Sequence, residues 1–363
     1  MVSNQKLQNA LNEMKEITKR DMALFNMKGK LMAHTTDVDR AMEQIVGEFA
    51  SSMAETQSYR EFQFFKVVVE GEVEYIYMLW GNDEAAFVIG QMAVCQIRNL
   101  VISMEEQFDR NNFIQNVLLG NMLTVDIYTR ARKMHIEPAA RVVYVIDTGK
   151  KDNEVAVEMV KNLSDLKSGD FVTCLDEHSV ILIKDIRHIP LDKREEELKS
   201  IADSLVDNLH MEAMIKVRVG YGNVVEQIPE IAASYQEAKL ALEVGRVFYA
   251  EYDTISYGKL GIGRLIYQLP MSLCNMFIKE VFGDEVPEIL DDEEAMSTIN
   301  RFFENNLNIS ETARQLYVHR NTLVYRLERI EKAIGLDIRT FEDAMTFRIA
   351  VMVLAHMKNQ GQD

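Results

Sequence analysis

The side chains best suited to binding chemistry cluster between residues 308 and 330. Arg320, Asn321, Thr322, Tyr325 and Arg326 follow one another closely there. Arginine can donate two hydrogen bonds to guanine, asparagine can pair with adenine, and threonine and tyrosine can contact a phosphate or the thymine methyl group. These residue types therefore indicate contact with duplex DNA. The candidate DNA-binding residues are Ser310, Thr312, His319, Arg320, Asn321, Thr322, Tyr325, Arg326 and Arg329.

Two short helices joined by a tight turn would position these side chains. Ser310 is a favourable N-cap for the first helix, whose Ala313 and Leu316 are expected to face inward. Ala313 is small, as a close crossing of two helices requires. Residues 317–318 would then form the turn.

The second helix is expected to begin at His319 or Asn321. Leu323, Leu327 and Ile330 have helical spacing and would form its buried face, so that the polar residues lie on the opposite face. The pattern predicts a helix-turn-helix whose second helix reads a DNA groove. The alternative is a helical hairpin inside a larger bundle, with its arginines simply solvated.

The charge of the C-terminal segment favours DNA contact there. The 363 residues carry a net charge of −17, which argues against coating of nucleic acid or an anionic membrane by the whole surface. Residues 296–360 nevertheless contain nine Lys and Arg against seven Asp and Glu, whereas residues 1–295 contain 31 against 49. A contact with a polyanion is therefore expected in residues 296–360.

No arrangement of residues typical of catalysis or metal binding occurs in the sequence. Cys95, Cys174 and Cys274 lie far apart, and the seven histidines form no H-x-x-x-H pair. Nucleophile-elbow and phosphate-binding-loop motifs are also missing. We therefore expect no catalytic residues, no metal and no cofactor. The N-terminus lacks the apolar core of a signal peptide, and the apolar stretches are well short of 18 residues, so we expect a cytoplasmic protein without a membrane contact.

The first hundred residues combine helical and strand patterns. Helices are predicted over 4–20 and 37–55, a β-hairpin over 22–34, and two further strands over 62–70 and 74–80. This mixture is typical of a small α+β sensor domain.

An apolar seam follows at Val94, Ile97, Val101, Met104 and Phe108, with alternating spacings of three and four. Such a seam is typical of a helix that pairs with a second copy and leads out of the first domain. A helix packed on its own domain gives the same pattern, and both interpretations stay open. The polar run 105–112 is consistent with a domain boundary.

The middle of the chain shows the order of an α/β sandwich. Strands are predicted over 141–147, 170–175, 179–183 and 216–221, and helices over 153–166, 195–210 and 228–244. Helices over 262–282 and 295–307 come next, separated by an acidic, proline-containing linker over 284–294.

Residues 294–358 resemble the C-terminal helix-turn-helix of the PucR/CdaR family of bacterial transcription regulators. The run His-Arg-Asn-Thr-Leu-x-Tyr-Arg-Leu-x-Arg-Ile stands at 319–330, followed by Gly-Leu-Asp at 335–337. The resemblance implies that the second helix binds DNA.

The middle domain resembles the GGDEF-like domain of the same family, which is itself similar to diguanylate cyclases. The resemblance rests on the strand that ends at Asp147, the hairpin at 175–177 and the segment 234–239. Cyclase chemistry needs glycines before Asp176, where this chain has Cys174 and Leu175. The departure implies a structural module without nucleotide chemistry.

The first domain resembles, more loosely, the sugar-diacid-recognition sensor of CdaR-type regulators, through residues 24–29 and 33–40. The resemblance implies a ligand site in which Arg40 would hold a carboxylate in a bidentate manner. The family's glycine and histidine after this arginine are replaced here by residues such as Ala41 and Met42. The candidate ligand-binding residues are Asn26, Lys28, His34, Thr35, Thr36 and Arg40.

We therefore predict an α+β multidomain protein. Its parts would be a PAS-like sensor at 1–106, a connecting helix at 107–135, a degenerate GGDEF-like α/β sandwich at 136–250, a helical linker at 251–295 and an all-α helix-turn-helix domain at 296–360. The predicted function is ligand-responsive, sequence-specific regulation of a catabolic or transport operon. The partners would be double-stranded DNA, a small-molecule effector (a carboxylate among the candidates) and a second copy of the chain. The alternatives are a cyclic-dinucleotide enzyme and a sensor or scaffold that does not bind DNA.

Overall fold

The structure is a computed structural model that describes residues 4–149, 153–164 and 169–360. The chain divides into two compact units, Met1–Phe113 and Ile114–Asp363. The division falls inside one long helix, α3 (Glu84–Leu118), which runs unbroken through the polar stretch where the sequence suggested a boundary.

The first unit is built around a five-stranded antiparallel sheet. Its strands are β1 (Met22–Asn26), β2 (Leu31–His34), β3 (Thr56–Tyr59), β4 (Phe62–Val69) and β5 (Glu72–Trp80), in the order β2-β1-β5-β4-β3. The predicted hairpin and the pair of longer strands are thus confirmed. The short edge strand β3 was not predicted.

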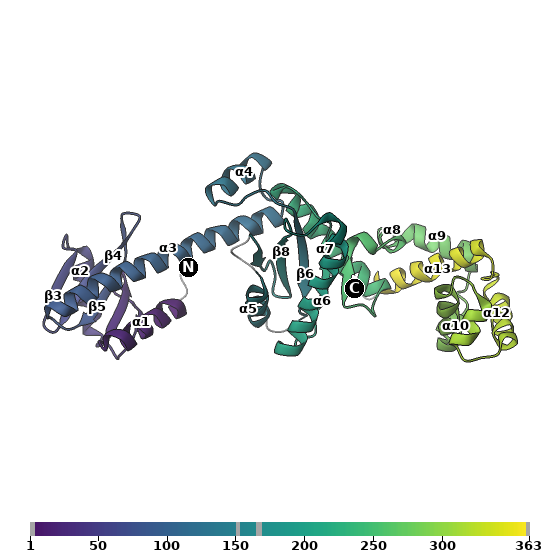
Figure 1. Cartoon of the computed structure of the whole chain (residues 1–363), viewed down its shortest axis with the longest axis horizontal. Coiled ribbons are helices and arrows are strands. Elements are labelled where there is room, and N and C mark those ends of the chain that lie inside the picture. Colours follow the sequence, from purple (N-terminus) through teal and green to yellow (C-terminus); the bar gives the residue numbers. More distant parts are fainter. Residues whose placement is uncertain (1–3, 150–152, 165–168, 361–363) are drawn as a thin grey trace. The chain divides into compact units, whose positions relative to one another are not determined.

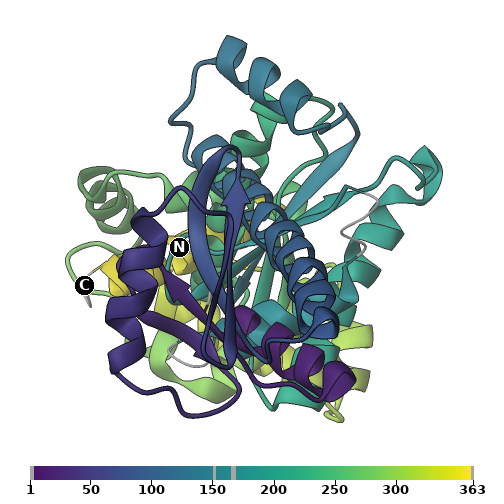
Figure 2. The same cartoon turned by 90° about the vertical axis from the view of Figure 1, so that its left-hand side faces the viewer.

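Helices cover both faces of this sheet, as Figure 2 shows. Alternate residues of each strand point to opposite faces. Leu24 and Phe65 therefore pack with α1 (Asn4–Thr18) and α3, whereas Phe25 and Phe64 pack with α2 (Ala41–Ser51) on the other face. Gly90 lets α3 come close to the sheet, because a Cβ there would lie 2.1 Å from the ring of Phe65.

The seam on α3 packs partly on its own sheet. Ile97 and Val101 are buried in the core formed with α1, which supports the own-domain interpretation for these two residues. By length and composition α3 could also cross a membrane, which differs from the expectation from the sequence. The expectation counted only unbroken apolar runs, whereas α3 reaches the required apolarity with polar residues interspersed.

The second unit contains a five-stranded mixed sheet. Its strands are β6 (Arg141–Asp147), β7 (Phe171–Thr173), β8 (Ser179–Asp185), β9 (Arg218–Tyr221) and β10 (Thr254–Ser256), in the order β10-β9-β6-β8-β7. The strand β6 pairs antiparallel with β8 and β9, whereas β9 and β10 are parallel. The predicted strands are confirmed, and the short strand β10 is an addition.

Helices α5 (Asn153–Leu163) and α6 (Arg194–Ala213) cover one face of this sheet, and α7 (Ile231–Phe248) covers the other. The α7 backbone lies very close to β9, because a Cβ on Gly220 would stand 2.4 Å from the carbonyl oxygen of Ala238. Residues 165–166 of the predicted helix 153–166 lie outside the described part. The helix α4 (Thr124–Lys133) and the 3-10 turns η1 (Leu191–Lys193) and η2 (Ile228–Glu230) complete this part.

The remaining chain is helical (Figure 1). The turn η3 (Tyr257–Lys259) leads into α8 (Ile262–Tyr267) and α9 (Met271–Phe282), so the single helix predicted over 262–282 is broken before Pro270, which cannot donate a backbone hydrogen bond. Then come η4 (Glu288–Asp291), α10 (Glu293–Glu304), α11 (Ile309–Gln315), α12 (Arg320–Ile334) and α13 (Phe341–Gln360).

The last helix, α13, belongs to two hydrophobic cores. Phe347 packs with Ile299 and Leu327 of α10 and α12. One to two turns later, Ala350 and Val353 pack with α8 and α9 residues such as Cys274. Helix α13 thereby joins the C-terminal helices to the segment that follows the sheet.

Candidate nucleic-acid interface

Helices α11 and α12 form the predicted helix-turn-helix. Ala313 on α11 is 4% exposed and lies in the same core as Leu323, Leu327 and Ile330 of α12. The turn between the helices places Tyr317 in the left-handed region, with φ +55°. The buried face of α12 is therefore the one that the spacing predicts.

The caps of the two helices fix where each begins. The backbone N–H of Asn321 donates to Nδ1 of His319 at 3.2 Å, so that His319 is the N-cap of α12, one of the two predicted starts. The N-cap of α11 is Asn308, whose side-chain oxygen accepts from the backbone N–H of Glu311 at 3.1 Å. The prediction that Ser310 caps this helix is wrong, because Ser310 already lies inside the helix on its exposed side.

The Gly-Leu-Asp segment closes α12 and turns the chain toward α13. Gly335 adopts φ +75° at the C-cap, a conformation that glycine enters without strain. Asp337 accepts a hydrogen bond from Nε of Arg339 at 2.6 Å, and this contact lowers the pKa of the Asp337 carboxyl. The backbone N–H of Asp337 in turn donates to Asp343 on α13.

The start of α12 presents a continuous polar face to solvent. His319, Arg320, Asn321 and Thr322 are all exposed, and Tyr325 one turn later is 69% exposed. The N-terminal end of a helix also carries partial positive charge from the aligned peptide dipoles, which favours contact with phosphate oxygens. This face can therefore supply both phosphate and base contacts.

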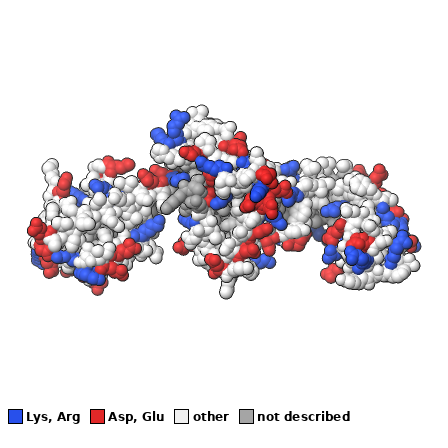
Figure 3. Space-filling model, in the orientation of Figure 1, with Lys and Arg blue, Asp and Glu red and all other residues white. Residues whose placement is uncertain are grey.

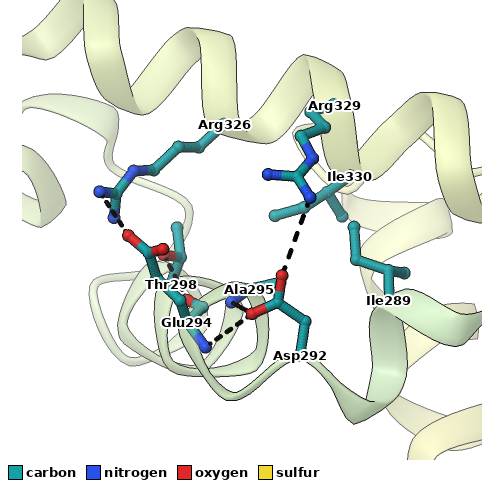
Figure 4. A pocket seen from close by; sticks show the side chains of 8 residues that line it. All are labelled: Ile289, Asp292, Glu294, Ala295, Thr298, Arg326, Arg329 and Ile330. Carbon is teal, nitrogen blue, oxygen red and sulfur yellow. Dashed lines mark hydrogen bonds and ion pairs between the residues drawn. The ribbon is translucent and has the colours of Figure 1, made fainter.

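Two further arginines of α12 point instead toward α10, as Figure 4 shows. The guanidinium of Arg326 lies 2.6 Å from Glu294, and that of Arg329 lies 3.9 Å from Asp292. Arg326 is half-buried, with 31% of its side chain exposed. The pocket between them has a volume of about 50 Å³, which leaves room for little more than water. Arg326 therefore does not belong to the freely exposed face predicted from the sequence.

Thr312 does not fit the predicted DNA-binding set. Its side chain is fully buried, and its hydroxyl donates to the carbonyl oxygen of Asn308 at 2.8 Å. The expectation that this side chain contacts DNA is therefore wrong, because the helical register turns it into the core.

The carboxylates of the middle domain are held by neighbouring groups. Asp147, at the end of β6, pairs with Arg246 of α7. Asp176 accepts hydrogen bonds from the backbone N–H of His178 and the hydroxyl of Ser179, each at 2.8 Å. Within the part of the chain that the structure describes, no group of three or more Asp, Glu, His or Cys could hold a metal ion.

The structure does not gather the candidate ligand residues of the first unit in one place. Asn26 caps the hairpin turn by accepting from the backbone of Lys28 and Lys30, whereas His34 pairs with Ala23 at the far end of the same hairpin. Three residues along a strand separate these ends by about 10 Å.

Thr35 and Thr36 lie at the His34 end. The Thr35 hydroxyl donates to Asp21 at 2.9 Å, and the Thr36 carbonyl oxygen lies 3.0 Å from Nδ1 of His34. Arg40 is exposed directly before α2. The sequence placed these residues together only through their closeness along the chain.

Two parts of the chain match known protein families. Residues 120–244 match the GGDEF-like domain, and residues 295–353 match the PucR C-terminal helix-turn-helix domain. The first range runs from α4 to most of α7 and stops before β10, and the second runs from α10 to the middle of α13.

Two regulators are among the similar proteins. The purine catabolism regulatory protein of Bacillus subtilis is 28% identical over 135 residues, which are 37% of this chain and 25% of that protein. The carbohydrate diacid regulator of Escherichia coli is 21% identical over 78% of this chain and 77% of its own length. This chain thus spans a quarter of the first relative and about three quarters of the second.

Among solved structures, a regulator of polyketide synthase expression from Bifidobacterium adolescentis covers 69% of this chain and 99% of its own, with 14% identity and a TM-score of 0.33.

Proposed function

Because this chain is a PucR/CdaR-family regulator with a GGDEF-like domain and a PucR-type C-terminal helix-turn-helix, we propose that it regulates transcription by sequence-specific binding of α12 to duplex DNA. The single observation that carries the proposal is the exposed polar face formed by His319, Arg320, Asn321 and Thr322.

The positions of the residues on α12 indicate which of them would contact bases and which would contact phosphates. Arg320 and Asn321 lie in the first turn, where a recognition helix contacts base edges. Thr322 and Tyr325 are exposed beside them and suit phosphate or thymine contacts. Ser310 is exposed near the start of α11, the helix that crosses the phosphate backbone in such motifs.

Charge supports the same location. Figure 3 shows basic side chains along the α12 edge of the C-terminal helices. Residues 296–360 carry a net positive charge in a chain of −17. Since the attraction to DNA phosphates decays over about 8–10 Å at physiological salt, this local surface matters more than the total.

The proposal includes a small-molecule effector and a homodimer. One helix-turn-helix buries only roughly 600–1,000 Å² on DNA, so that specific binding favours two modules acting together. A carboxylate held by Arg40 remains the proposed effector of the first unit, since Arg40 is exposed directly before α2.

The test measures binding of the full chain to duplexes selected from a random pool, by fluorescence anisotropy. Arg320→Ala is expected to lower affinity for the selected duplex about 5- to 150-fold, which corresponds to about 1–3 kcal/mol for a base contact. The matched control is Arg301→Ala, which removes an exposed arginine of α10 that pairs with Glu304.

Equal affinities of the two variants for the selected duplex would contradict the assignment of α12. Failure to enrich any sequence from the pool would contradict sequence-specific binding itself.

A further inference from the structure

The second unit contains a large cavity at one edge of its sheet. Its volume is about 510 Å³, within the range of about 300–1,000 Å³ that small-molecule sites occupy. Its walls come from α6, the end of β9, the whole of β10, the α7–β10 loop and η3.

The position of the cavity follows from the topology. Strands β9 and β10 are parallel, and Tyr221 and Ser256 are paired at their last positions. The cavity therefore extends along the edge strand β10, from the loop that enters this strand to the turn that follows it, and reaches the carboxyl end of β9 at Tyr221.

Three tyrosines give the cavity an aromatic lining. Tyr221 is 5% exposed, and its ring centroid lies 5.4 Å from that of Tyr144, so it is fixed in the core. The hydroxyl of Tyr249 donates to the carbonyl oxygen of Leu260 at 3.1 Å, which fixes a second ring. Tyr252 is 57% exposed. The aromatic surface of Tyr249 and Tyr252 at this cavity favours a flat aromatic ligand.

Two lysines add positive charge at the rim. Nζ of Lys259 lies 2.7 Å from Glu195, and Nζ of Lys199 lies 4.0 Å from Asp203. All four side chains are well exposed, and such surface pairs contribute only about 0–1 kcal/mol. Either ammonium group can therefore turn from its carboxylate to an anionic group on a ligand.

We propose that this cavity binds a small planar aromatic anion, stacked on the tyrosines and paired with Lys259. After Leu260 the wall continues into α8, and α8 packs on α13 of the DNA-binding helices. A ligand bound in the cavity could therefore change DNA binding through the contact between α8 and α13. That regulatory consequence rests on the proposed function, whereas the binding itself does not.

The experiment titrates the full chain with 8-anilinonaphthalene-1-sulfonate, an aromatic sulfonate, by calorimetry and fluorescence. We expect one saturable site per chain, and an affinity at least threefold weaker in Lys259→Gln. The matched control is Lys279→Gln, because Lys279 also pairs with one exposed carboxylate at 2.7 Å but lies outside the cavity. N-phenyl-1-naphthylamine, which lacks the sulfonate, should bind the wild type and Lys259→Gln equally.

Equal affinity of the two lysine variants for the sulfonate would overturn the proposal, as would the lack of a saturable site in the wild type. An equal loss of the neutral analogue would show that Lys259 acts through structure and would overturn the charge pairing. A second variant, Ser256→Phe, fills the cavity and should abolish the site, so a site that survives it lies elsewhere. Each of these measurements is made without DNA, so that a failure of DNA binding would be recognised separately.

Discussion

Replacing Glu294 by glutamine is expected to raise affinity for DNA about three- to twelvefold at low salt, which corresponds to about 0.7–1.5 kcal/mol. Glu294 pairs with Arg326 at 2.6 Å, and this pair must be broken or shared if Arg326 contacts a phosphate, as the sequence predicts. The two side chains are 70% and 31% exposed, so the pair contributes about 0.2–1 kcal/mol. Repulsion between the carboxylate and a phosphate about 8 Å away adds about 0.5 kcal/mol before screening.

The assay is the fluorescence anisotropy of a labelled duplex, titrated with the full chain at several salt concentrations. Glu293→Gln is the matched control, because it removes the same charge from an exposed neighbour that pairs with none of the described residues. The difference between the two variants should shrink toward 0.5 M salt, where the Debye length falls to a few ångströms.

Equal affinities of the two variants at every salt concentration would refute the reasoning. Weaker binding by Glu294→Gln would also refute it, because Glu294 would then hold Arg326 in the orientation that DNA requires.

Three further substitutions test the fold that carries the site. Ala313→Leu should destabilise the helix-turn-helix by about 1–3 kcal/mol in denaturant unfolding, since it overpacks a buried helix crossing, and unchanged stability would contradict this crossing. Gly220→Ala should also lower stability, because its Cβ would lie 2.4 Å from the carbonyl oxygen of Ala238, and an unchanged melting temperature would argue against the close approach of α7. Burial tends to raise the pKa of Asp185, but hydrogen bonds from Arg187 outweigh it and hold the pKa below its ordinary value. The carboxylate then stabilises the fold at pH values above its unfolded pKa of about 3.9. Asp185→Asn should therefore lower the free energy of unfolding by about 3 kcal/mol at pH 7, and this loss should shrink as the pH falls below 4. A loss that does not depend on pH would contradict this.

Much of the fold could be predicted because the spacing of apolar residues along a helix or strand determines which of its faces is buried. The spacing of Leu323, Leu327 and Ile330 fixes which face of α12 is buried, and the structure confirms it. The apolar run at 141–147 identifies a strand buried on both faces, and β6 is the central strand of its sheet.

The remaining features depend on contacts that the sequence order does not reveal. Asn308 and Ser310 are equally good caps by type, and the left-handed turn at Asn306 and Leu307 places the helix start at the earlier one. The edge strands β3 and β10 have only four and three residues, so pairing with a neighbour rather than an apolar pattern defines them.

The candidate site likewise contains features that local spacing predicts and features that depend on long-range contacts. Exposure of Arg320 and Asn321 follows from helical spacing alone. The pairing of Arg326 with Glu294 joins residues 32 positions apart and could not be read from either segment. The cavity beside β10 escaped prediction for a similar reason, because its lysines and tyrosines come from four separate elements.

The packing of α13 in two hydrophobic cores limits which fragments of this protein can fold on their own. A fragment cut before α10 would retain Phe347 in its core but would leave Ala350 and Val353 without the partners that α8 and α9 supply. Such a fragment should self-associate in solution, because these apolar side chains would be exposed to water. Because α13 packs in both cores, the two neighbouring parts should unfold together. A substitution that destabilises α8 or α9 should therefore also lower the stability of the helix-turn-helix in the absence of DNA.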